Sequence, residues 1–328
     1  MNNKQPSKRD SRAIGRRVIT LFIMLSLIFV SACGDRSKKD SETYTVGTWK
    51  TAQTIQPFFY QDYLPEGASF EVLPFTNPGD QKTALLAGEL DMCGTTWVTA
   101  ITAASKGEPV KVVAGMTEKC SALVTKSGDE INQVADLKGK VIAYVPGTMH
   151  HILLLETLQK NGLDVDQDVT LLQIDFFDMG AALADGQIDA FCSGEPYPSI
   201  AVLEGYGKIL EYPYYDDSVG FINAGMLTTD TQIADHPERV QALVDAHIEA
   251  TKYLMEHSDI WLERAAEFGT EQAVLEQALD NMELVWDITP ETIQQVKNLA
   301  QRMYELDIIS TVPDIDELID LQFLPAGK

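Results

Sequence analysis

The stretch Ala84–Asp91, with the sequence ALLAGELD, returns 98 residues later as Ala182–Asp189, with the sequence ALADGQID. In both copies a helix end is followed by a glycine and then by the entry to a strand. Glycine directly after a last helical turn is a common helix stop, because it adopts a left-handed conformation without steric cost. Each copy lies inside a strand–helix–strand unit. The repeat therefore predicts two related lobes.

Strands and helices alternate along the chain around these two copies. Strands are predicted at residues 44–47, 68–73, 90–93, 110–114, 122–125, 140–144, 169–174 and 188–191. Helices are predicted at residues 80–87, 148–160 and 178–184, and amphipathic helices follow from residue 236 onward, including 270–279 and 290–306. Such alternation is typical of α/β domains in which helices cover parallel sheets.

The first 33 residues have the layout of an export signal. Six Lys or Arg residues in the first 17 positions precede an uncharged apolar run, 18–30, which is too short to span a bilayer. The run closes with Val30-Ser31-Ala32-Cys33, which resembles a bacterial lipobox. We expect a signal peptide over 1–32, a diacylated (palmitate-type) Cys33 and a polar flexible tether over 33–43. The protein is thus predicted on the extracytoplasmic face of the cell membrane, held by its lipid anchor.

Charge and cysteine content narrow the classes of partner. The full chain carries a net charge of −24, and removal of residues 1–32 leaves about −29. A surface of this charge repels nucleic acid and anionic headgroups, so neither is expected as a partner. Besides Cys33 the chain has Cys93, Cys120 and Cys192, whose spacing fits no zinc site. We interpret them as buried apolar residues, with a Cys93–Cys120 disulfide as the alternative.

Two further segments carry a family resemblance: Gly147-Thr148-Met149-His150 followed by Leu153-Leu154, and the stretch from Asp178-Met179 to Gly194-Glu195-Pro196. In order and spacing, residues 44–227 resemble the periplasmic binding proteins of ABC importers for nitrate, sulfonates, taurine, bicarbonate and thiamine-pyrimidine precursors. The resemblance implies a two-lobed α/β fold of the type II periplasmic binding proteins. Each lobe then holds a mostly parallel sheet flanked by helices, and two hinge strands cross between the lobes near 122–125 and 222–227.

The same resemblance implies the division of the chain and its role. Residues 44–123 and 222–328 are expected to form lobe 1, and residues 124–221 lobe 2. The protein would capture a small solute between the lobes, as a monomer, and deliver it to an ABC permease with its ATPase subunits.

Ligands of open α/β sheets bind in loops beyond the carboxyl ends of the strands. Thr148 is expected to cap a helix whose N-terminus suits an electron-rich ligand, and Glu195 offers a carboxylate to N–H donors or to a cation. Aromatic residues on the same loops suit a flat ligand, although core packing explains them as well. The predicted ligand-binding residues are Trp49, Thr95, Thr96, Trp97, Thr117, Thr148, His150, Glu195, Tyr197 and Asn223.

The ligand class is suggested by a missing residue type. No arginine occurs between Arg36 and Arg239, although arginine is the usual bidentate partner of planar oxyanions. This favours a neutral or amine-bearing heteroaromatic, such as a pyrimidine precursor. An aliphatic sulfonate, nitrate or bicarbonate remains the alternative, held by helix N-termini, hydroxyls and Lys50 or Lys119.

Two other function classes, an enzyme and a soft-metal scavenger, fit the residues less well. Fungal thiamine-pyrimidine synthases share the expected fold, but the chain has no GxSxG, HExxH or GxxxxGK motif, so no catalytic residue and no cofactor are predicted. Residues 164–168 imitate a calcium loop, yet Val169 stands where the loop needs glycine. A soft-metal scavenger would use Met92, Cys93, Met116, Cys120, Met149, His150 and Cys192, but such residues are more often core. No metal ligands are therefore predicted.

Overall fold

The computed structural model describes residues 43–76 and 78–325. The predicted signal peptide, the lipidated Cys33 and the tether up to residue 42 lie outside these residues. From Tyr44 onward the chain clusters as one compact unit. Within the described ranges no helix is both long enough and apolar enough to cross a membrane.

The first sheet has six strands in the order β11-β4-β10-β3-β1-β2. β1 runs parallel to β3, whereas β10 runs antiparallel to both β3 and β4. The strands are β1 (Thr43–Thr48), β2 (Ser69–Pro74), β3 (Met92–Thr96), β4 (Val110–Lys119), β10 (Ile222–Thr229) and β11 (Met282–Leu284). We call this sheet with its helices lobe 1.

The second sheet has five strands in the order β7-β6-β8-β5-β9. β6 is parallel to β7 and β8, and β5 is antiparallel to β8 and β9. The strands are β5 (Ser121–Lys126), β6 (Val141–Tyr144), β7 (Thr170–Gln173), β8 (Ala190–Gly194) and β9 (Gly207–Glu211). We call this sheet with its helices lobe 2. The predicted α/β organisation in two sheets is confirmed, and each sheet is mixed because the strands next to the crossings run antiparallel.

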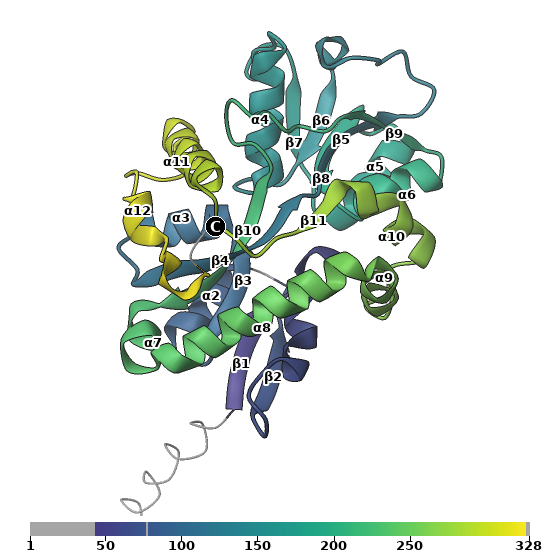
Figure 1. The fold of residues 1–328 in the computed structure, drawn as a ribbon. Helices are drawn as coiled ribbons and strands as arrows, with labels where there is room; N and C mark the ends of the chain where they lie inside the picture. The colour runs from purple at the N-terminus through teal and green to yellow at the C-terminus, as the bar shows by residue number, and fades with distance from the viewer. Residues whose placement is uncertain (1–42, 77, 326–328) are drawn as a thin grey trace, which may run out of the picture. The chain divides into compact units, whose positions relative to one another are not determined.

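Helices cover both sheets (Figure 1). They are α2 (Pro78–Leu86), α3 (Trp97–Ser105), α4 (Met149–Lys160), α5 (Phe176–Ala184), α6 (Tyr197–Leu203), α7 (Asp230–Asp235), α8 (Pro237–Glu256), α9 (Ser258–Ala266), α10 (Gln272–Ala278), α11 (Pro290–Glu305) and α12 (Ile315–Leu318). α4, α5 and α6 contact the second sheet, and α3 packs between the first sheet and α11. α10 departs from this division, because it follows the helices of lobe 1 in the chain yet lies beside α6 of lobe 2.

The repeat seen in the sequence is a repeat in the structure. Gly88 is the second residue after α2, and Gly186 is the second residue after α5. Their φ values are 75° and 72°. Behind them the amide of Glu89 donates to the carbonyl of Ala84 at 3.0 Å, and the amide of Gln187 donates to that of Ala182 at 2.9 Å. Both copies thus close their helix with the same backbone bond before β3 and β8.

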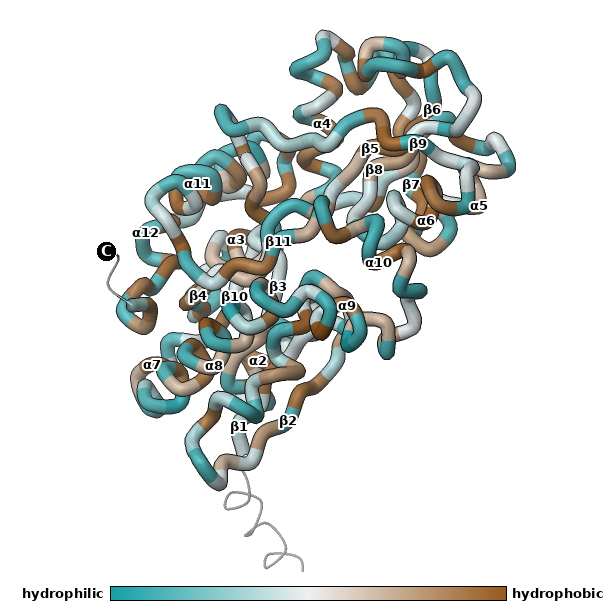
Figure 2. Tube along the Cα trace, turned by 45° about the vertical axis from the view of Figure 1, so that its right-hand side comes forward, coloured by the Kyte–Doolittle hydropathy of each residue, from teal (hydrophilic) through white to brown (hydrophobic). Residues whose placement is uncertain are grey.

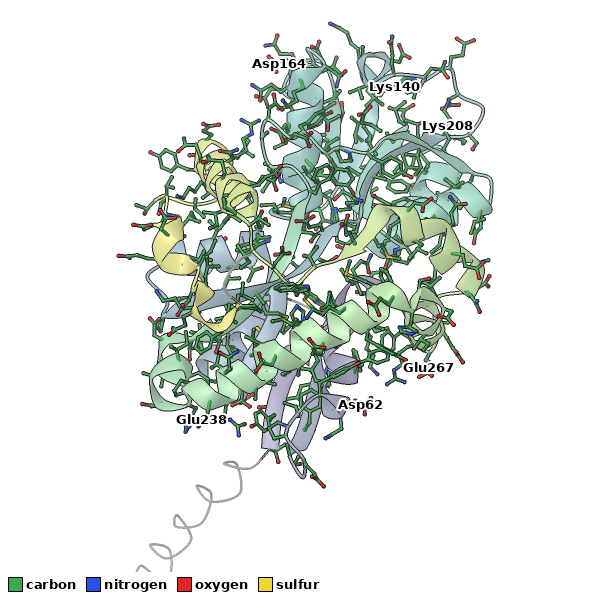
Figure 3. All side chains as sticks on the ribbon, viewed as in Figure 1. Asp62, Lys140, Asp164, Lys208, Glu238 and Glu267 are labelled. Atoms are coloured by element: carbon green, nitrogen blue, oxygen red, sulfur yellow. The ribbon has the colours of Figure 1, made fainter. Side chains whose placement is uncertain are left out.

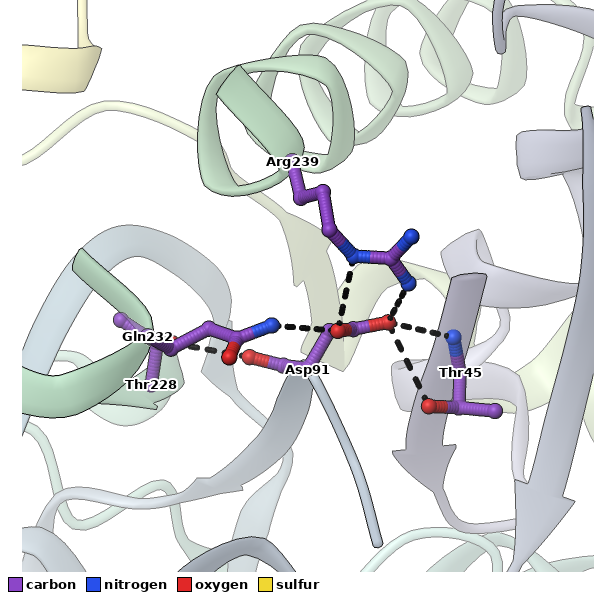
Figure 4. Close-up of polar contacts among 5 residues, drawn as sticks. All are labelled: Thr45, Asp91, Thr228, Gln232 and Arg239. Carbon is purple, nitrogen blue, oxygen red and sulfur yellow. Dashed lines mark hydrogen bonds and ion pairs between the residues drawn. The ribbon is translucent and has the colours of Figure 1, made fainter. Parts of the chain in front are cut away.

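Asp91, the last residue of the first copy, holds a buried ion pair with Arg239 of α8 (Figure 4). Arg239 Nη2 lies 2.6 Å from Asp91 Oδ2, and Arg239 Nε lies 3.1 Å from Oδ1. Gln232 and Thr45 also donate to this carboxylate. The ion pair fixes α8 to the amino end of β3, away from the carboxyl ends where ligands bind.

The chain passes from the first sheet to the second at Lys119 and Cys120. Both residues have left-handed backbone conformations, with φ values of 62° and 71°. Such values cost energy in residues other than glycine and persist where surrounding contacts enforce them. Here the amide of Lys119 donates to Phe221 at 2.7 Å, and that of Cys120 donates to Asn281 at 2.8 Å. The crossing is therefore held by hydrogen bonds to the residue before β10 and to the residue before β11.

Apolar and charged residues are separated as a folded α/β protein requires. In Figure 2 apolar residues are frequent along the strands, whereas hydrophilic residues colour many of the loops and outer helix turns. The charged residues labelled in Figure 3, Asp62, Lys140, Asp164, Lys208, Glu238 and Glu267, point away from the sheets. Cys93, Cys120 and Cys192 are buried with free thiols, so the described part of the chain contains no Cys93–Cys120 disulfide.

Candidate functional site

A cavity of about 320 Å³ lies at the carboxyl ends of strands from both sheets. This volume is at the small end of the usual range for ligand pockets. We call it the interlobe cavity. Its lining comprises Trp49, Thr51, Gln53, Thr54, Thr76, Thr96, Thr99, Thr117, Cys120, Gly147, Thr148, Met149, His150, Phe176, Gly194, Glu195, Tyr197, Asn223 and Ala224.

The structure brings most of the predicted site residues together in this lining. They come from loops and helix starts that are far apart in the sequence. The predicted residues that line the interlobe cavity are Trp49, Thr96, Thr117, Thr148, His150, Glu195, Tyr197 and Asn223. Their role in binding stays a prediction, but their proximity follows from the two sheets meeting at this edge.

Thr95 and Trp97 do not line the cavity, in contrast to the expectation. Successive side chains of a strand point to opposite faces, so Thr95 turns away from the side on which Thr96 lies. It is 1% exposed. Trp97 is the first residue of α3 rather than a loop residue, and it is 2% exposed within the core of lobe 1. The aromatic wall predicted at Trp97 is therefore a core side chain.

Two helix N-termini, one from each lobe, reach the interlobe cavity. Thr96 caps α3 by accepting the amide of Thr99 at 3.2 Å. Thr148 caps α4 by accepting the amide of His151 at 3.2 Å, as expected for this residue. The first amides of a helix have no carbonyl partner within it, and the helix dipole makes this end positive. The two N-termini therefore favour a ligand with negative charge or with strong acceptor oxygens.

His150 is held in the cavity wall as a neutral ring. Its Nδ1 lies 2.8 Å from Ser121 Oγ, and its ring meets Phe176 edge-on with centroids 5.5 Å apart. Burial lowers the pKa of His150 to about 4. The ring also approaches Gly194 closely, where a Cβ atom would lie only 2.7 Å from His150 Cε1. His150 thus supplies a hydrogen-bonding ring without a charge. His151 contacts Tyr144 instead, as expected of a packing residue.

The Glu195 carboxylate is already bound by the protein. Oε1 accepts Asn281 Nδ2 at 3.1 Å, and Oε2 accepts the amide of Ser199 at 3.2 Å. Its carbonyl accepts Gln53 Nε2 from the loop after β1 at 2.7 Å, a hydrogen bond between the lobes. Burial raises the pKa of Glu195. The residue therefore links both lobes at the crossing, and each oxygen of its carboxylate already accepts one hydrogen bond from the protein.

Asn223 and Thr117 likewise have structural partners. Asn223 Nδ2 donates to the carbonyl of Lys119 at 2.8 Å and lies 2.9 Å from Cys120 Sγ. The Thr117 hydroxyl donates to the carbonyl of Glu283 at 2.9 Å. Both side chains support the crossing between the lobes, so a ligand would meet the Asn223 oxygen rather than its amide N–H groups.

The cysteines give no support to thiolate or metal chemistry. Burial raises the pKa of Cys120 to about 12 and raises those of Cys93 and Cys192 further. A protonated, buried thiol is a poor nucleophile and a poor metal ligand. Across the described residues no group of three or more His, Cys, Asp or Glu side chains is placed to hold a metal ion.

Several residues that line the interlobe cavity were not among the predicted site residues. Thr51, Gln53 and Thr54 follow β1, where Thr54 Oγ1 donates to the carbonyl of Trp49 at 3.0 Å and shapes the loop. Thr99 lies one turn into α3 and Phe176 opens α5. The signal for the first three was available, because they stand directly beyond the carboxyl end of a predicted strand.

Comparison with known proteins places this arrangement in a family. A family model described as "NMT1/THI5 like" matches residues 59–259, well over half of the chain. The chain belongs to the NMT1/THI5-like family. The crystal structure of the periplasmic aliphatic sulphonate binding protein SsuA from Escherichia coli has the same fold, with a TM-score of 0.76. It is 21% identical over 88% of this chain and 94% of its own. The predicted type II periplasmic-binding-protein fold is thereby confirmed.

Relatives of this member of the NMT1/THI5-like family include both binding proteins and an enzyme. A putative aliphatic sulfonates-binding protein of Escherichia coli (strain K12) is 32% identical over 130 residues, which cover 39% of this chain and 40% of that protein. The 4-amino-5-hydroxymethyl-2-methylpyrimidine phosphate synthase of Schizosaccharomyces pombe is 31% identical over 146 residues, 43% of this chain and 41% of that enzyme. Both alignments span less than half of either chain.

Proposed function

We propose that this protein is the substrate-binding component of an ABC importer, and that its ligand is a small organic sulfonate bound in the interlobe cavity. One observation carries the choice of ligand: helix N-termini from both lobes, α3 and α4, open onto the same cavity. None of the described residues that line this cavity is Lys or Arg. The anion would therefore be held by backbone amides, by threonine hydroxyls and by the neutral ring of His150.

This choice departs from the pyrimidine ligand that the sequence favoured. That preference rested on the absence of arginine between Arg36 and Arg239, with aromatic residues and Glu195 as partners of the ligand. Asn281 and Ser199 each donate to one oxygen of Glu195, so part of its acceptor capacity is already used within the protein. A pyrimidine precursor stays the second candidate because Trp49 and Tyr197 line the cavity and suit a flat ring. Nitrate and bicarbonate rank below both candidates, since neither ion carries an apolar group that could lie against Trp49 or Tyr197.

A binding role is favoured over catalysis by the chemistry of the lining. The Cys120 thiol, with its pKa raised to about 12, stays protonated at neutral pH. The His150 ring, with its pKa lowered to about 4, is a weak base. An activated nucleophile needs the opposite shifts.

The proposal extends to location and partners. The lipobox-like sequence ending at Cys33 supports a lipid anchor on the extracytoplasmic face of the cell membrane, where the protein would serve a permease and its ATPase subunits as a monomer. Labelling with an acyl-chain analogue tests the anchor. Wild-type protein should carry the label and stay in the membrane fraction, whereas Cys33→Ala should be unlabelled.

Binding is tested by calorimetry and thermal shift with methanesulfonate, nitrate, bicarbonate and 4-amino-5-hydroxymethyl-2-methylpyrimidine. A ligand that binds the folded state raises the melting temperature by mass action. We expect methanesulfonate to bind and the others to have no effect. Binding of the pyrimidine alone would replace the first candidate by the second.

A matched pair of variants locates the site. Thr148 and Thr289 both cap a helix with their hydroxyl, α4 at the interlobe cavity and α11 elsewhere. Thr148→Val and Thr289→Val should each cost about 1 kcal/mol of stability. Only Thr148→Val should lower the affinity for methanesulfonate, by about 10-fold, as expected for about 1.4 kcal/mol.

A further inference from the structure

A second cavity of about 350 Å³ adjoins the interlobe cavity. The two share Trp49, Thr51, Gln53, Thr76 and Tyr197 in their linings, so one runs into the other. Nothing in the proposed binding of a sulfonate group makes use of this second space. We call it the aromatic cavity.

The residues that the aromatic cavity does not share with the interlobe cavity are mostly apolar. The residues that belong to the aromatic cavity alone are Lys50, Ala52, Phe75, Phe177, Pro196, Phe268, Gly269, Thr270, Leu275, Ala278 and Met282. Lys50 is the only charged side chain in the described lining, and it is exposed. Such a wall suits an uncharged, apolar group.

Aromatic rings connect the two cavities. The ring of Phe176, in the interlobe cavity, stacks on Tyr197 with an interplanar angle of 13° and centroids 6.3 Å apart. Tyr197 in turn meets Phe177 edge-on, with centroids 5.7 Å apart. Aromatic surface therefore continues from His150 and Phe176 through Tyr197 to Phe177 in the aromatic cavity.

Phe177 is unusual among these aromatic rings. Its side chain is 83% exposed, the largest value among the large hydrophobic residues of the described chain. Phe177 is the second residue of α5, and its side chain stays outside the core. Covering a phenylalanine gains about 1.5–3 kcal/mol. A ligand group lying against Phe177 would recover part of that free energy.

The rest of the wall of the aromatic cavity is held in place by contacts within the protein. Trp261 Nε1 donates to the carbonyl of Ala52 at 2.8 Å and fixes the loop after β1. Phe268 packs on Phe58 with centroids 4.8 Å apart. Leu275 and Ala278 belong to α10, which lies beside α6. The cavity is thus bounded by both lobes, and it is formed before any ligand arrives.

We infer that the aromatic cavity receives the tail of the ligand, and that the substrates are sulfonates with an aromatic or comparably bulky apolar group. The inference rests on the proposed function, because it places the sulfonate group in the interlobe cavity. The distance to be spanned is short, since Trp49 and Tyr197 belong to both linings.

Calorimetry with methanesulfonate and naphthalene-2-sulfonate tests this. Methanesulfonate carries the anionic group alone, and naphthalene-2-sulfonate adds the flat tail. We expect both to bind, and the naphthalene compound to bind at least about 10-fold more tightly, as apolar burial of this size predicts. Equal affinities would overturn the tail site and leave the proposed function intact. If neither compound binds, the proposed ligand class fails, and the tail site fails with it.

Two variants outside the interlobe lining test the location. Phe177→Ala removes one wall of the aromatic cavity, and Thr270→Trp fills it. Each should weaken naphthalene-2-sulfonate binding by about 3- to 10-fold while methanesulfonate binding is unchanged. Leu172→Ala, a matched control with a 42% exposed side chain in lobe 2, should change neither. A naphthalene affinity that survives both variants would place the tail elsewhere.

Discussion

The carboxylate of Asp189 accepts the amide of Val141 at 2.8 Å, while the amide of Asp189 donates to the carbonyl of Val141 at 2.9 Å. Asp91 makes the same two bonds to Thr45, at 2.8 and 2.9 Å. Each aspartate ends one copy of the repeat; Asp91 fastens β3 to β1, and Asp189 fastens β8 to β6. The two lobes therefore share their strand-joining chemistry as well as their sequence pattern.

The two aspartates should differ in how much they stabilise the fold. Asp91 also faces Arg239, with side chains only 10% and 12% exposed, whereas Asp189 and Lys140 are about one-third exposed. Asp91→Ala would remove the carboxylate that pairs with a buried guanidinium and should cost about 3–5 kcal/mol. Asp189→Ala should cost about 1–2 kcal/mol. Urea unfolding measures both, and a double variant Asp91→Ala/Arg239→Met should recover part of the first loss.

Substitutions of the neighbours Trp97 and Thr96 should have different effects, the first on stability and the second on ligand affinity. Trp97→Ala removes a core side chain and should lower the free energy of unfolding by about 3–5 kcal/mol, while the folded fraction keeps its ligand affinity. Thr96→Val keeps the volume but removes the α3 cap at the interlobe cavity, so its main effect should be on affinity. A Trp97→Ala protein that is stable but does not bind would contradict the core placement.

Gly194→Ala should disrupt binding through His150. The new Cβ atom would lie 2.7 Å from His150 Cε1 and 2.8 Å from Nε2, so the ring must leave its place beside Ser121. We expect an affinity loss of about 10-fold or more by calorimetry. Because the effect runs through one ring, Gly194→Ala in a His150→Ala background should add little. Additive losses would indicate that Gly194 acts on the cavity independently.

Glu118 should make stability depend on pH. Burial, with Glu283 and Asp287 nearby, raises the pKa of Glu118 from 4.5 to about 7. The folded state therefore favours the protonated acid, and ionisation opposes folding increasingly as pH rises from about 4.5 through 7. Glu118→Gln should raise the free energy of unfolding by about 2 kcal/mol at pH 8 and by much less at pH 5. An equal gain at both pH values would assign the effect to packing.

The division into strand and helix units was predictable because its signals are local. Gly88, Gly186 and Gly162 stop helices by their own conformational freedom, and the apolar runs between them set the strands. The strands β9 and β11 were missed for the opposite reason. Their pairing partners, β5 and β4, lie some 80 to 170 residues away in the chain, so the short segments carry little signal of their own.

The site was predictable as a set of loops but not as a set of contacts. Thr148 and His150 follow a strand and open a helix, which places them at the carboxyl edge. Trp97 satisfies the same rule, yet it opens α3, a helix that was not predicted, and its ring is buried in the core. Glu195 lies where it was expected, but its bonds to Asn281 and Ser199 depend on tertiary contacts that no spacing reveals.

The contact of α10 with α6 gives lobe 2 a third attachment besides the two crossings at Cys120 and before β10. A lobe joined to its neighbour only by two adjacent strands can rotate about them as a hinge. In this protein such a rotation would either break the contact between α10 and α6 or move α10 together with lobe 2. If the protein binds its ligand between the lobes as proposed, we expect variants in the segment between α9 and β11 to change the rates of ligand exchange more than the affinity at equilibrium.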